Sequence, residues 1–214
     1  MDIEKGSQVL SGVAVRGLSV SRGERRLFEG LSLTLSAGDA VALTGANGAG
    51  KTSLLRAIAC FIRPDAGDIR FFSGDTAVEP ETARREAVHL LGHLEGLKPT
   101  RTARQELAFQ IEWLGGDAAG VEAAVDRLNL GALLDLETRK LSAGQRRRLS
   151  LARLIAAPRR LWLLDEPLAP LDAGWRSAAA ELMAAHLSAG GMILAAVHDP
   201  LPLEARSLDL AVRA

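Results

Sequence analysis

The 214-residue sequence contains one cysteine and no tyrosine, and its 26 Lys and Arg balance 26 Asp and Glu. A single cysteine excludes a disulfide within the chain. Balanced charge gives no global field that would attract nucleic acid or anionic lipid. No segment holds the ~18 uncharged apolar residues of a membrane span, and residues 1–12 lack the basic start and apolar centre of a signal peptide. These absences predict a cytoplasmic protein that reaches a membrane only through partners.

The length fits one large domain, or one domain with a subdomain. Apolar and polar residues alternate over residues 12–20 and 27–35, which predicts two half-buried strands joined by a charged turn and thus an antiparallel sheet. Four compact apolar segments further on alternate with helical segments, which predicts a parallel, doubly wound sheet. These strands are expected at residues 39–45, 85–93, 160–167 and 191–200.

The same pattern sets the expected domain boundaries. We expect residues 1–11 to form a flexible extension and residues 12–214 to form one domain. Residues 94–158 are mostly helical by pattern, which predicts a helical subdomain inserted into the parallel sheet. Cys60 lies in an apolar helical stretch, so we expect its side chain to be a small buried hydrophobe.

Residues 45–52 read GANGAGKT and match the pattern G-x-x-x-x-G-K-[ST] between a predicted strand and a predicted helix. The glycines allow backbone N–H groups to curl around phosphates. Lys51 is placed to reach the outer phosphates, and the Thr52 hydroxyl is a ligand that suits Mg²⁺. The expected nucleotide-binding residues here are Gly45, Ala46, Asn47, Gly48, Ala49, Gly50, Lys51, Thr52 and Ser53.

A later apolar strand ends in the acidic pair Asp165 and Glu166. The first carboxylate is placed to hold Mg²⁺ beside a phosphate loop. The second can orient and deprotonate the water that attacks the γ-phosphate. An acidic pair after a core strand is by itself an ordinary surface feature. Together with the phosphate loop, the pair predicts ATP hydrolysis.

Residues 141–150 read LSAGQRRRLS and place three arginines behind a small polar turn. A basic run alone favours nucleic acid or an acidic membrane surface, whereas this helix start offers backbone N–H groups to an anion. The balanced net charge weakens the first interpretation. We therefore expect Arg146, Arg147 and Arg148 to form a helix face of solvated and intrasubunit contacts, with no nucleic-acid partner.

The order and spacing of these motifs resemble those of ABC ATPases over residues 12–214. LSAGQ resembles their signature motif, LAPLD their D-loop, and AAVHD the strand that ends in their switch histidine. The resemblance implies an α/β P-loop ATPase core with an N-terminal antiparallel β subdomain and a helical subdomain. It implies ATP and Mg²⁺ as ligands, and a head-to-tail dimer in which the signature of one ATPase subunit closes over the ATP of the other. The residues it adds to the nucleotide site are Ser142, Gly144, Gln145 and Asp172.

The same resemblance implies that Lys51, Glu166 and His198 are the catalytic residues. A lone histidine after an apolar strand is usually structural. The place of His198 after the D-loop implies instead that it senses the γ-phosphate and holds the attacking water with Glu166. Thr52 and Asp165 are the implied Mg²⁺ ligands.

Two positions depart from the ABC ATPase pattern. Arg22 stands where the family places an aromatic ring against adenine, and a guanidinium also stacks on a purine, although with weaker orientation. His93 stands where the family has a glutamine that serves Mg²⁺ and water. His93 is therefore a candidate metal ligand and nucleotide contact, and its alternative role is packing at a strand end or contact with a membrane partner.

His93, Ala143 and the segments GANGAGKTSLLR and HDPLPL are similar to those of the ATP-binding subunits of cytochrome c maturation systems, which are haem exporters. This resemblance implies integral membrane transporter subunits as partners, a haem-chaperone pathway, and a position on the cytoplasmic face of the inner membrane. The ATPase subunit of another small-molecule ABC transporter is the alternative. A nucleotide-gated clamp in DNA repair or translation, or a non-hydrolysing scaffold, fits less well with one cassette and an intact catalytic set.

Overall fold

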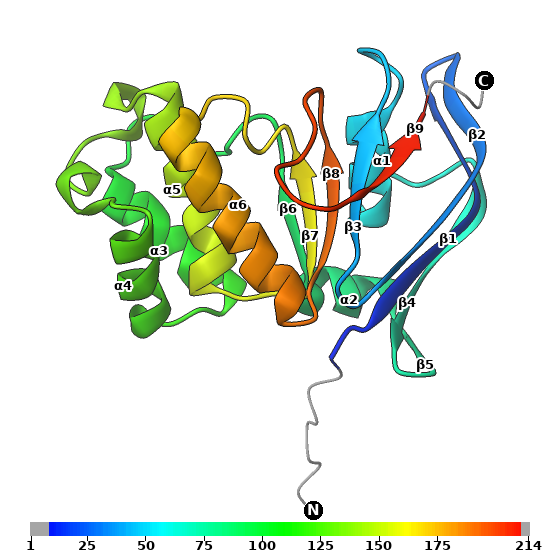
Figure 1. The fold of residues 1–214 in the computed structure, drawn as a ribbon, viewed down its shortest axis with the longest axis horizontal. Helices are drawn as coiled ribbons and strands as arrows, with labels where there is room; N and C mark the ends of the chain where they lie inside the picture. Colours follow the sequence, from blue (N-terminus) through cyan, green and yellow to red (C-terminus); the bar gives the residue numbers. More distant parts are fainter. Residues whose placement is uncertain (1–8, 211–214) are drawn as a thin grey trace, which may run out of the picture.

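The structure, a computed structural model, describes residues 9–210. An antiparallel sheet, a parallel sheet and a group of helices lie side by side along the longest axis (Figure 1). The antiparallel sheet has the strand order β2-β1-β4-β5, and its first hairpin pairs Gly12 with Ser36 and Arg22 with Arg25. This confirms the predicted N-terminal hairpin. Its strands are β1 (Gly12–Arg22), β2 (Arg25–Ser36), β4 (Ala66–Ser73) and β5 (Thr76–Val78).

The second sheet has the order β6-β7-β8-β3-β9, and every pairing in it is parallel. Its central strands are buried along almost their whole length, as expected for a sheet covered on both faces. The predicted doubly wound core is therefore confirmed. Its strands are β3 (Ala40–Thr44), β6 (Val88–Leu91), β7 (Leu161–Asp165), β8 (Met192–Ala196) and β9 (Arg206–Asp209).

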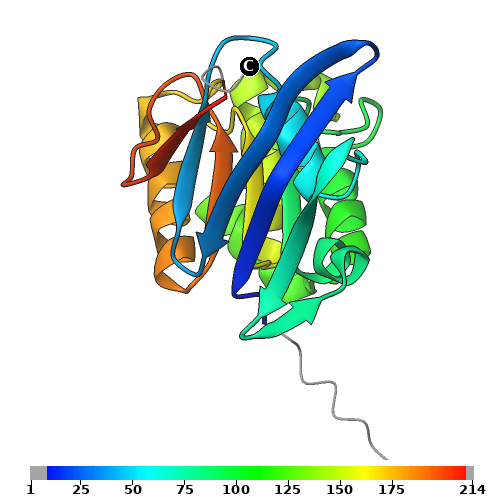
Figure 2. The same cartoon turned by 90° about the vertical axis from the view of Figure 1, so that its right-hand side faces the viewer.

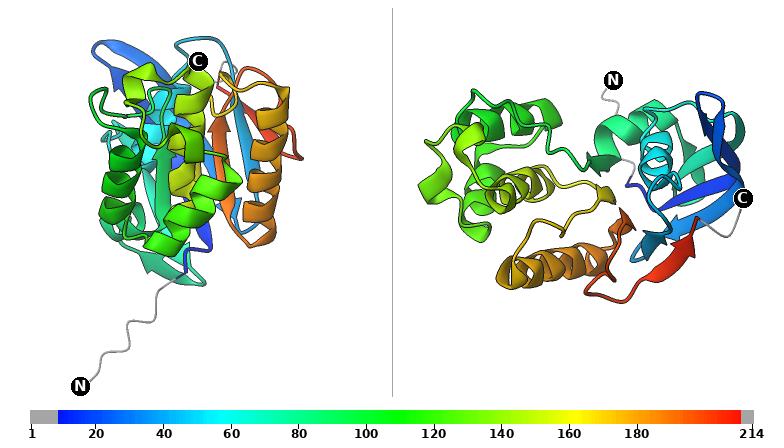
Figure 3. Two further views of the ribbon diagram at one scale, coloured as in Figure 1. Left: turned by 90° about the vertical axis from the view of Figure 1, so that its left-hand side faces the viewer. Right: turned by 90° about the horizontal axis from the view of Figure 1, so that it is seen from above.

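Helices α1 and α2 lie on the side of the parallel sheet that faces the antiparallel sheet, and α3 to α6 lie on its other side (Figures 1, 2 and 3). Leu54 and Leu55 of α1 share one buried core with residues of both sheets. A second core joins the helical region to the opposite face of the parallel sheet. The helices are α1 (Lys51–Ile58), α2 (Pro80–Ala87), α3 (Ala103–Leu114), α4 (Ala118–Arg127), α5 (Ala143–Ala156) and α6 (Ala173–Ser188), with short 3-10 turns η1 (Gly131–Leu133) and η2 (Thr138–Lys140).

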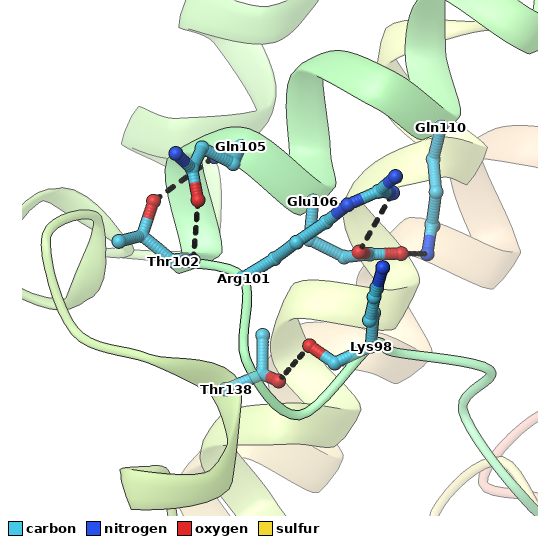
Figure 4. Close-up of polar contacts among 7 residues, drawn as sticks. All are labelled: Lys98, Arg101, Thr102, Gln105, Glu106, Gln110 and Thr138. Atoms are coloured by element: carbon cyan, nitrogen blue, oxygen red, sulfur yellow. Dashed lines mark hydrogen bonds and ion pairs between the residues drawn. The ribbon is translucent and has the colours of Figure 1, made fainter.

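Polar contacts hold the segment that enters the helical region (Figure 4). The Thr138 hydroxyl donates to the carbonyl oxygen of Lys98 at 2.8 Å. The buried Glu106 carboxylate accepts a hydrogen bond from Gln110 at 2.8 Å and lies 3.4 Å from the Arg101 guanidinium. A buried carboxylate needs such partners, so the start of α3 is fixed in place.

The structure corrects one predicted strand and adds three. Residues 80–87 form α2, with Pro80 in its first turn, so the strand expected from residue 85 begins only at Val88. Strands β4, β5 and β9 are mostly exposed or half-buried, and the alternation pattern does not predict them. Residues 1–8 of the expected extension lie outside the described residues, while Leu10 is buried.

Cys60 is exposed, so the expectation of a buried side chain is wrong. Helix α1 ends at Ile58, and Cys60 adopts a φ of 59°, in the left-handed region. Its side chain therefore does not continue the buried face of the helix on which Leu54, Leu55 and Ile58 lie.

Candidate nucleotide-binding site

The phosphate loop folds around the side chain of Lys51. Its ammonium group donates to the carbonyl oxygens of Gly45 at 2.6 Å and of Ala46 at 3.4 Å. Helix α1 begins directly behind the loop, at Gly50, and no side chain among residues 9–210 caps it. The first N–H groups of an uncapped helix attract anions, so the loop and helix together form a phosphate site.

Glycine is required at two positions of the loop. Gly50 has a φ of 102°, and a Cβ there would come within 2.9 Å of the Phe28 ring. Gly48 has a φ of 82° and lies beneath the Arg25 guanidinium, whose terminal nitrogens would be 3.9 Å from a Cβ. The close contact with Phe28 on β2 joins the loop to the antiparallel sheet.

Thr52 and Asp165 meet across the base of the cleft. The Thr52 hydroxyl, in the first turn of α1, donates to Asp165 Oδ2 at 2.8 Å, and Asp165 ends β7 almost fully buried. Hydroxyl and carboxylate oxygens are the donors that Mg²⁺ prefers, so this pair has the right chemistry for the ion.

Glu166 and His198 face each other from the ends of adjacent strands β7 and β8. Glu166 Oε1 is 3.5 Å from His198 Nε2, and within the described part of the chain this buried oxygen has no hydrogen-bond partner. The backbone of Glu166 has a φ of 49°, and its N–H donates to the Ala196 carbonyl at 3.0 Å. A left-handed non-glycine residue is strained, and such strain clusters at functional sites.

These residues line one cleft of about 560 Å³, within the range of small-molecule sites. Residues 46–53 form its floor, and Arg22, His93, Asp165, Glu166 and His198 complete the predicted part of its wall. Leu27 and Ala169 also line it and were not predicted, because an apolar wall residue carries no motif. Gly45 contacts the Lys51 ammonium but is not among the lining residues.

The signature residues lie away from this cleft. Ser142 caps α5 by accepting from the Gln145 N–H at 3.2 Å, and the Gln145 side chain accepts from the Ser142 N–H at 2.8 Å. Gly144 approaches the D-loop, since a Cβ there would be 3.0 Å from the Pro170 carbonyl oxygen. Asp172 caps α6 by accepting from the Trp175 N–H at 2.9 Å. The S-x-x-Q spacing is a capping-box signal in the sequence.

The three arginines all bond backbone carbonyls of their own chain. Arg146 donates to Leu141, and Arg148 donates to Leu128 and Asn129. This confirms the expected intrasubunit contacts. Arg147 is 1% exposed, so the expectation of a solvated face is wrong at that position.

Residues 28–169 match the ABC transporter family. The chain belongs to this family. A cytochrome c biogenesis ATP-binding export protein, CcmA, of Rhodopseudomonas palustris (strain BisB5) is 46% identical over 199 residues, which cover 93% of this chain and 98% of the relative. The CcmA protein of Nitrobacter winogradskyi is 46% identical over 194 residues, covering 91% and 95%.

Solved structures show the same fold. A putative ABC transporter ATP-binding protein from Pyrococcus furiosus has a TM-score of 0.81 at 21% identity, covering 95% of this chain and all of its own. A dimeric ATP-binding cassette in a post-hydrolysis state, bound to ADP and Pi, has a TM-score of 0.75 at 19% identity and covers 87% of this chain and 88% of its own. These matches confirm the predicted ABC ATPase fold. Within residues 9–210, no helix is both long and apolar enough to span a bilayer.

Proposed function

We propose that this chain is the ATP-hydrolysing subunit of an ABC transporter complex that drives haem export, or release to a haem chaperone, in cytochrome c biogenesis. The observation that carries the proposal is the meeting of Lys51, the Thr52–Asp165 pair and the Glu166–His198 pair in one cleft. Family membership supports the ATPase chemistry, and CcmA relatives of nearly equal length support the role in cytochrome c biogenesis.

In the proposed reaction, the phosphate loop and Lys51 bind the β- and γ-phosphates. Thr52 and Asp165 would hold Mg²⁺, with His93 as a further candidate ligand, and the bound ion would withdraw charge from the phosphate oxygens. Glu166 accepts a proton from water as that water attacks the γ-phosphorus. The bond between the γ-phosphorus and the ADP oxygen then breaks. His198 holds the water with Glu166.

The unpartnered Oε1 atom of Glu166 supports its role as the base. A buried carboxylate oxygen without a hydrogen bond is costly, and an attacking water would supply the missing donor. This oxygen lies 3.5 Å from His198 Nε2. Its position in the same cleft as the phosphate loop supports Glu166 as a proton acceptor that is available before nucleotide binds.

The proposed assembly is a head-to-tail dimer docked on integral membrane subunits at the cytoplasmic face of the inner membrane. Ser142, Gly144 and Gln145 lie outside their own cleft, which fits a role at the ATP of a second chain, with Asp172 at the D-loop between them. The likeness to dimeric cassettes supports this arrangement.

Glu166→Gln tests the catalytic assignment. The amide keeps the size of the side chain but is no base, so hydrolysis should fall about 100-fold or more while ATP affinity stays within about twofold. Hydrolysis at the parental rate would contradict the assignment. Complementation tests the biological role: the chain should restore covalently bound haem in c-type cytochromes of cells that lack CcmA, and Glu166→Gln should not. If the parent chain has ATPase activity but does not restore these cytochromes, the ATPase subunit of another small-molecule transporter is favoured.

A further inference from the structure

Helix α5 is bonded to the segment that carries His93. Arg147 Nη1 donates to the carbonyl oxygen of Gly92 at 3.1 Å, and Nη2 donates to the carbonyl oxygen of His93 at 3.2 Å. One residue of α5 thus holds two successive carbonyl groups with the two arms of its guanidinium. Planar forked donation of this kind fixes orientation as well as distance.

A second arginine of α5, six positions or about 1.7 turns later, makes a similar contact. Arg153 donates to the carbonyl oxygen of Glu95 at 3.0 Å and is half-buried. Burial lowers the pKa of Arg153 to about 10, against the opposing charge of Glu106. The same segment is held further on by the bond from Thr138 to Lys98 (Figure 4). Residues 92–98 are therefore attached to the helical region at several points.

The burial of Arg147 requires an explanation. Its side chain is 1% exposed, and among residues 9–210 its Nε has no hydrogen-bond partner and none of the ion pairs includes it. Burial lowers the pKa of this guanidinium, and the charges of Glu95, Asp165 and Glu166 act in the opposite direction. An apolar side chain would fill this space at less cost. The forked bond to the His93 segment is what an apolar side chain would lose.

We propose that Arg147 is a positioning residue that ties residues 92–95 to α5, so that the His93 side chain keeps its place in the nucleotide cleft and follows any movement of α5. Ser142 caps the same helix. Arg147 comes five positions after Ser142, a rise of about 7.5 Å along the helix. The inference rests on the proposed function, because ATP on a second chain would contact α5 at Ser142.

Hydrogen exchange of the backbone amides of residues 92–98 tests this tie. The chain carries Glu166→Gln to retain ATP and is compared with the same chain carrying Arg147→Met or Arg148→Met. Arg148 is the matched control, because it is adjacent and half-buried and also bonds two carbonyls. Its hydrogen bonds within the described residues go to Leu128 and Asn129, and it lies over the Trp175 ring at 4.1 Å.

Without nucleotide, Arg147→Met should speed exchange of these amides about tenfold or more, and Arg148→Met should not, because only the first change removes the tie. With ATP and Mg²⁺, the parent and Arg148→Met should gain protection there, and Arg147→Met should bind ATP without that gain. Unchanged exchange in Arg147→Met overturns the proposal, as does a parent that dimerises with ATP while these amides do not respond. A chain that neither binds ATP nor dimerises contradicts the proposed function instead, and the nucleotide-free comparison still decides the tie.

Steady-state ATPase assays, with Glu166 present, separate positioning from general damage. Arg147→Met should lower kcat about tenfold with KM nearly unchanged, and adding His93→Ala should lower it no further, because coupled residues are not additive. Additive losses, or a His93→Ala variant with parental kcat, would overturn the proposal. If Arg147→Met does not fold, Arg147→Lys keeps the charge without the fork and should still loosen residues 92–98.

Discussion

Helices α1 and α5 begin in opposite ways. Helix α1 begins at a glycine, no side chain of the described residues caps it, and its first turn faces the nucleotide cleft. Helix α5 begins after Ser142, and a capping box between Ser142 and Gln145 pairs the N–H groups of these two residues. Both sequences resemble anion sites, but of these two helix starts only that of α1 stands beside a lysine in a cleft of the same chain.

We interpret the start of α1 as part of a site that one chain completes by itself. We interpret the start of α5 as a surface that is stable without ligand. An open helix start needs an anion to satisfy its donors, which suits the nucleotide that the chain binds itself. A helix start with a capping box is folded before any partner binds, which suits a surface that contacts the ATP of a second chain. The chain therefore binds ATP alone in our interpretation and needs a second copy only for the α5 contact.

Lys51→Ala should have the largest effect, because it breaks the open site. The phosphate loop folds around the Lys51 ammonium group, and charge-assisted bonds to phosphate are strong. Affinity for a fluorescent ATP analogue should fall at least about 100-fold. Lys140→Ala, which removes an exposed lysine near the start of α5, is the control and should bind normally. Binding retained by Lys51→Ala would remove the distinction between the two helix starts.

Ser142→Arg should disrupt the proposed dimer contact at the start of α5 without weakening ATP binding at the phosphate loop. In the Glu166→Gln background, ATP should drive dimerisation of the parent, and the added bulk and charge should prevent it. Thr102→Arg is the matched control, because Thr102 caps α3 with the same kind of capping box. Losing such a cap costs about 1 kcal/mol of stability. Sedimentation should show dimers for Thr102→Arg and monomers for Ser142→Arg. Dimers for both would exclude Ser142 from the interface.

A buried histidine contacts the C-terminal end of α5. His89 Nε2 lies 2.7 Å from the carbonyl oxygen of Ala157, the residue that follows α5, and burial lowers the pKa of His89 to about 3. The unfolded chain takes up a proton here as the pH falls below about 6.5, and the native state does not. The contribution of His89 is full above about pH 6.5 and is lost as the pH falls toward 3.

Thermal unfolding between pH 4 and 7 measures this loss. His89 alone should contribute up to about 1.4 kcal/mol of destabilisation per pH unit. His89→Gln should flatten the decline by that amount. A slope equal to that of the parent would show that His89 is not neutral in the native state.

The sequence alone predicts the open site well because its chemistry is local. The loop, Lys51 and Thr52 are consecutive, and Asp165 and Glu166 follow a strand whose apolar run is easily recognised. Parallel strands bring these carboxyl ends to one edge, so motif order already implies the cleft. Leu27 and Ala169 were missed because their roles depend only on where other elements fold.

The environment of α5 is harder to predict. Three consecutive arginines look equivalent in the sequence, yet Arg147 is buried and Arg146 and Arg148 are not. Which one faces inward depends on the helix phase and on a segment some 50 residues earlier, and neither is a local property. The exposure of Cys60 is hard to predict for a similar reason. Helix α1 ends within an apolar run, and Cys60 after it is left-handed.

Substitution of Arg22 should have the smallest effect. It tests whether the nucleotide cleft recognises the base as well as the phosphates. Arg22 lines the cleft where ABC ATPases place an aromatic ring, and no aromatic residue of the described chain lines it. A guanidinium stacks on any purine, so ATP and GTP should compete for the site within about threefold of each other. Arg22→Tyr should strengthen ATP binding by about three- to fivefold, since an aromatic pair adds ~0.5–1.5 kcal/mol. Arg26→Tyr, on the same hairpin but paired with Glu29, is the control and should change nothing. Competition assays with ATP, GTP and CTP distinguish the cases. A parent that prefers ATP to GTP more than about tenfold would show that base recognition comes from residues other than Arg22.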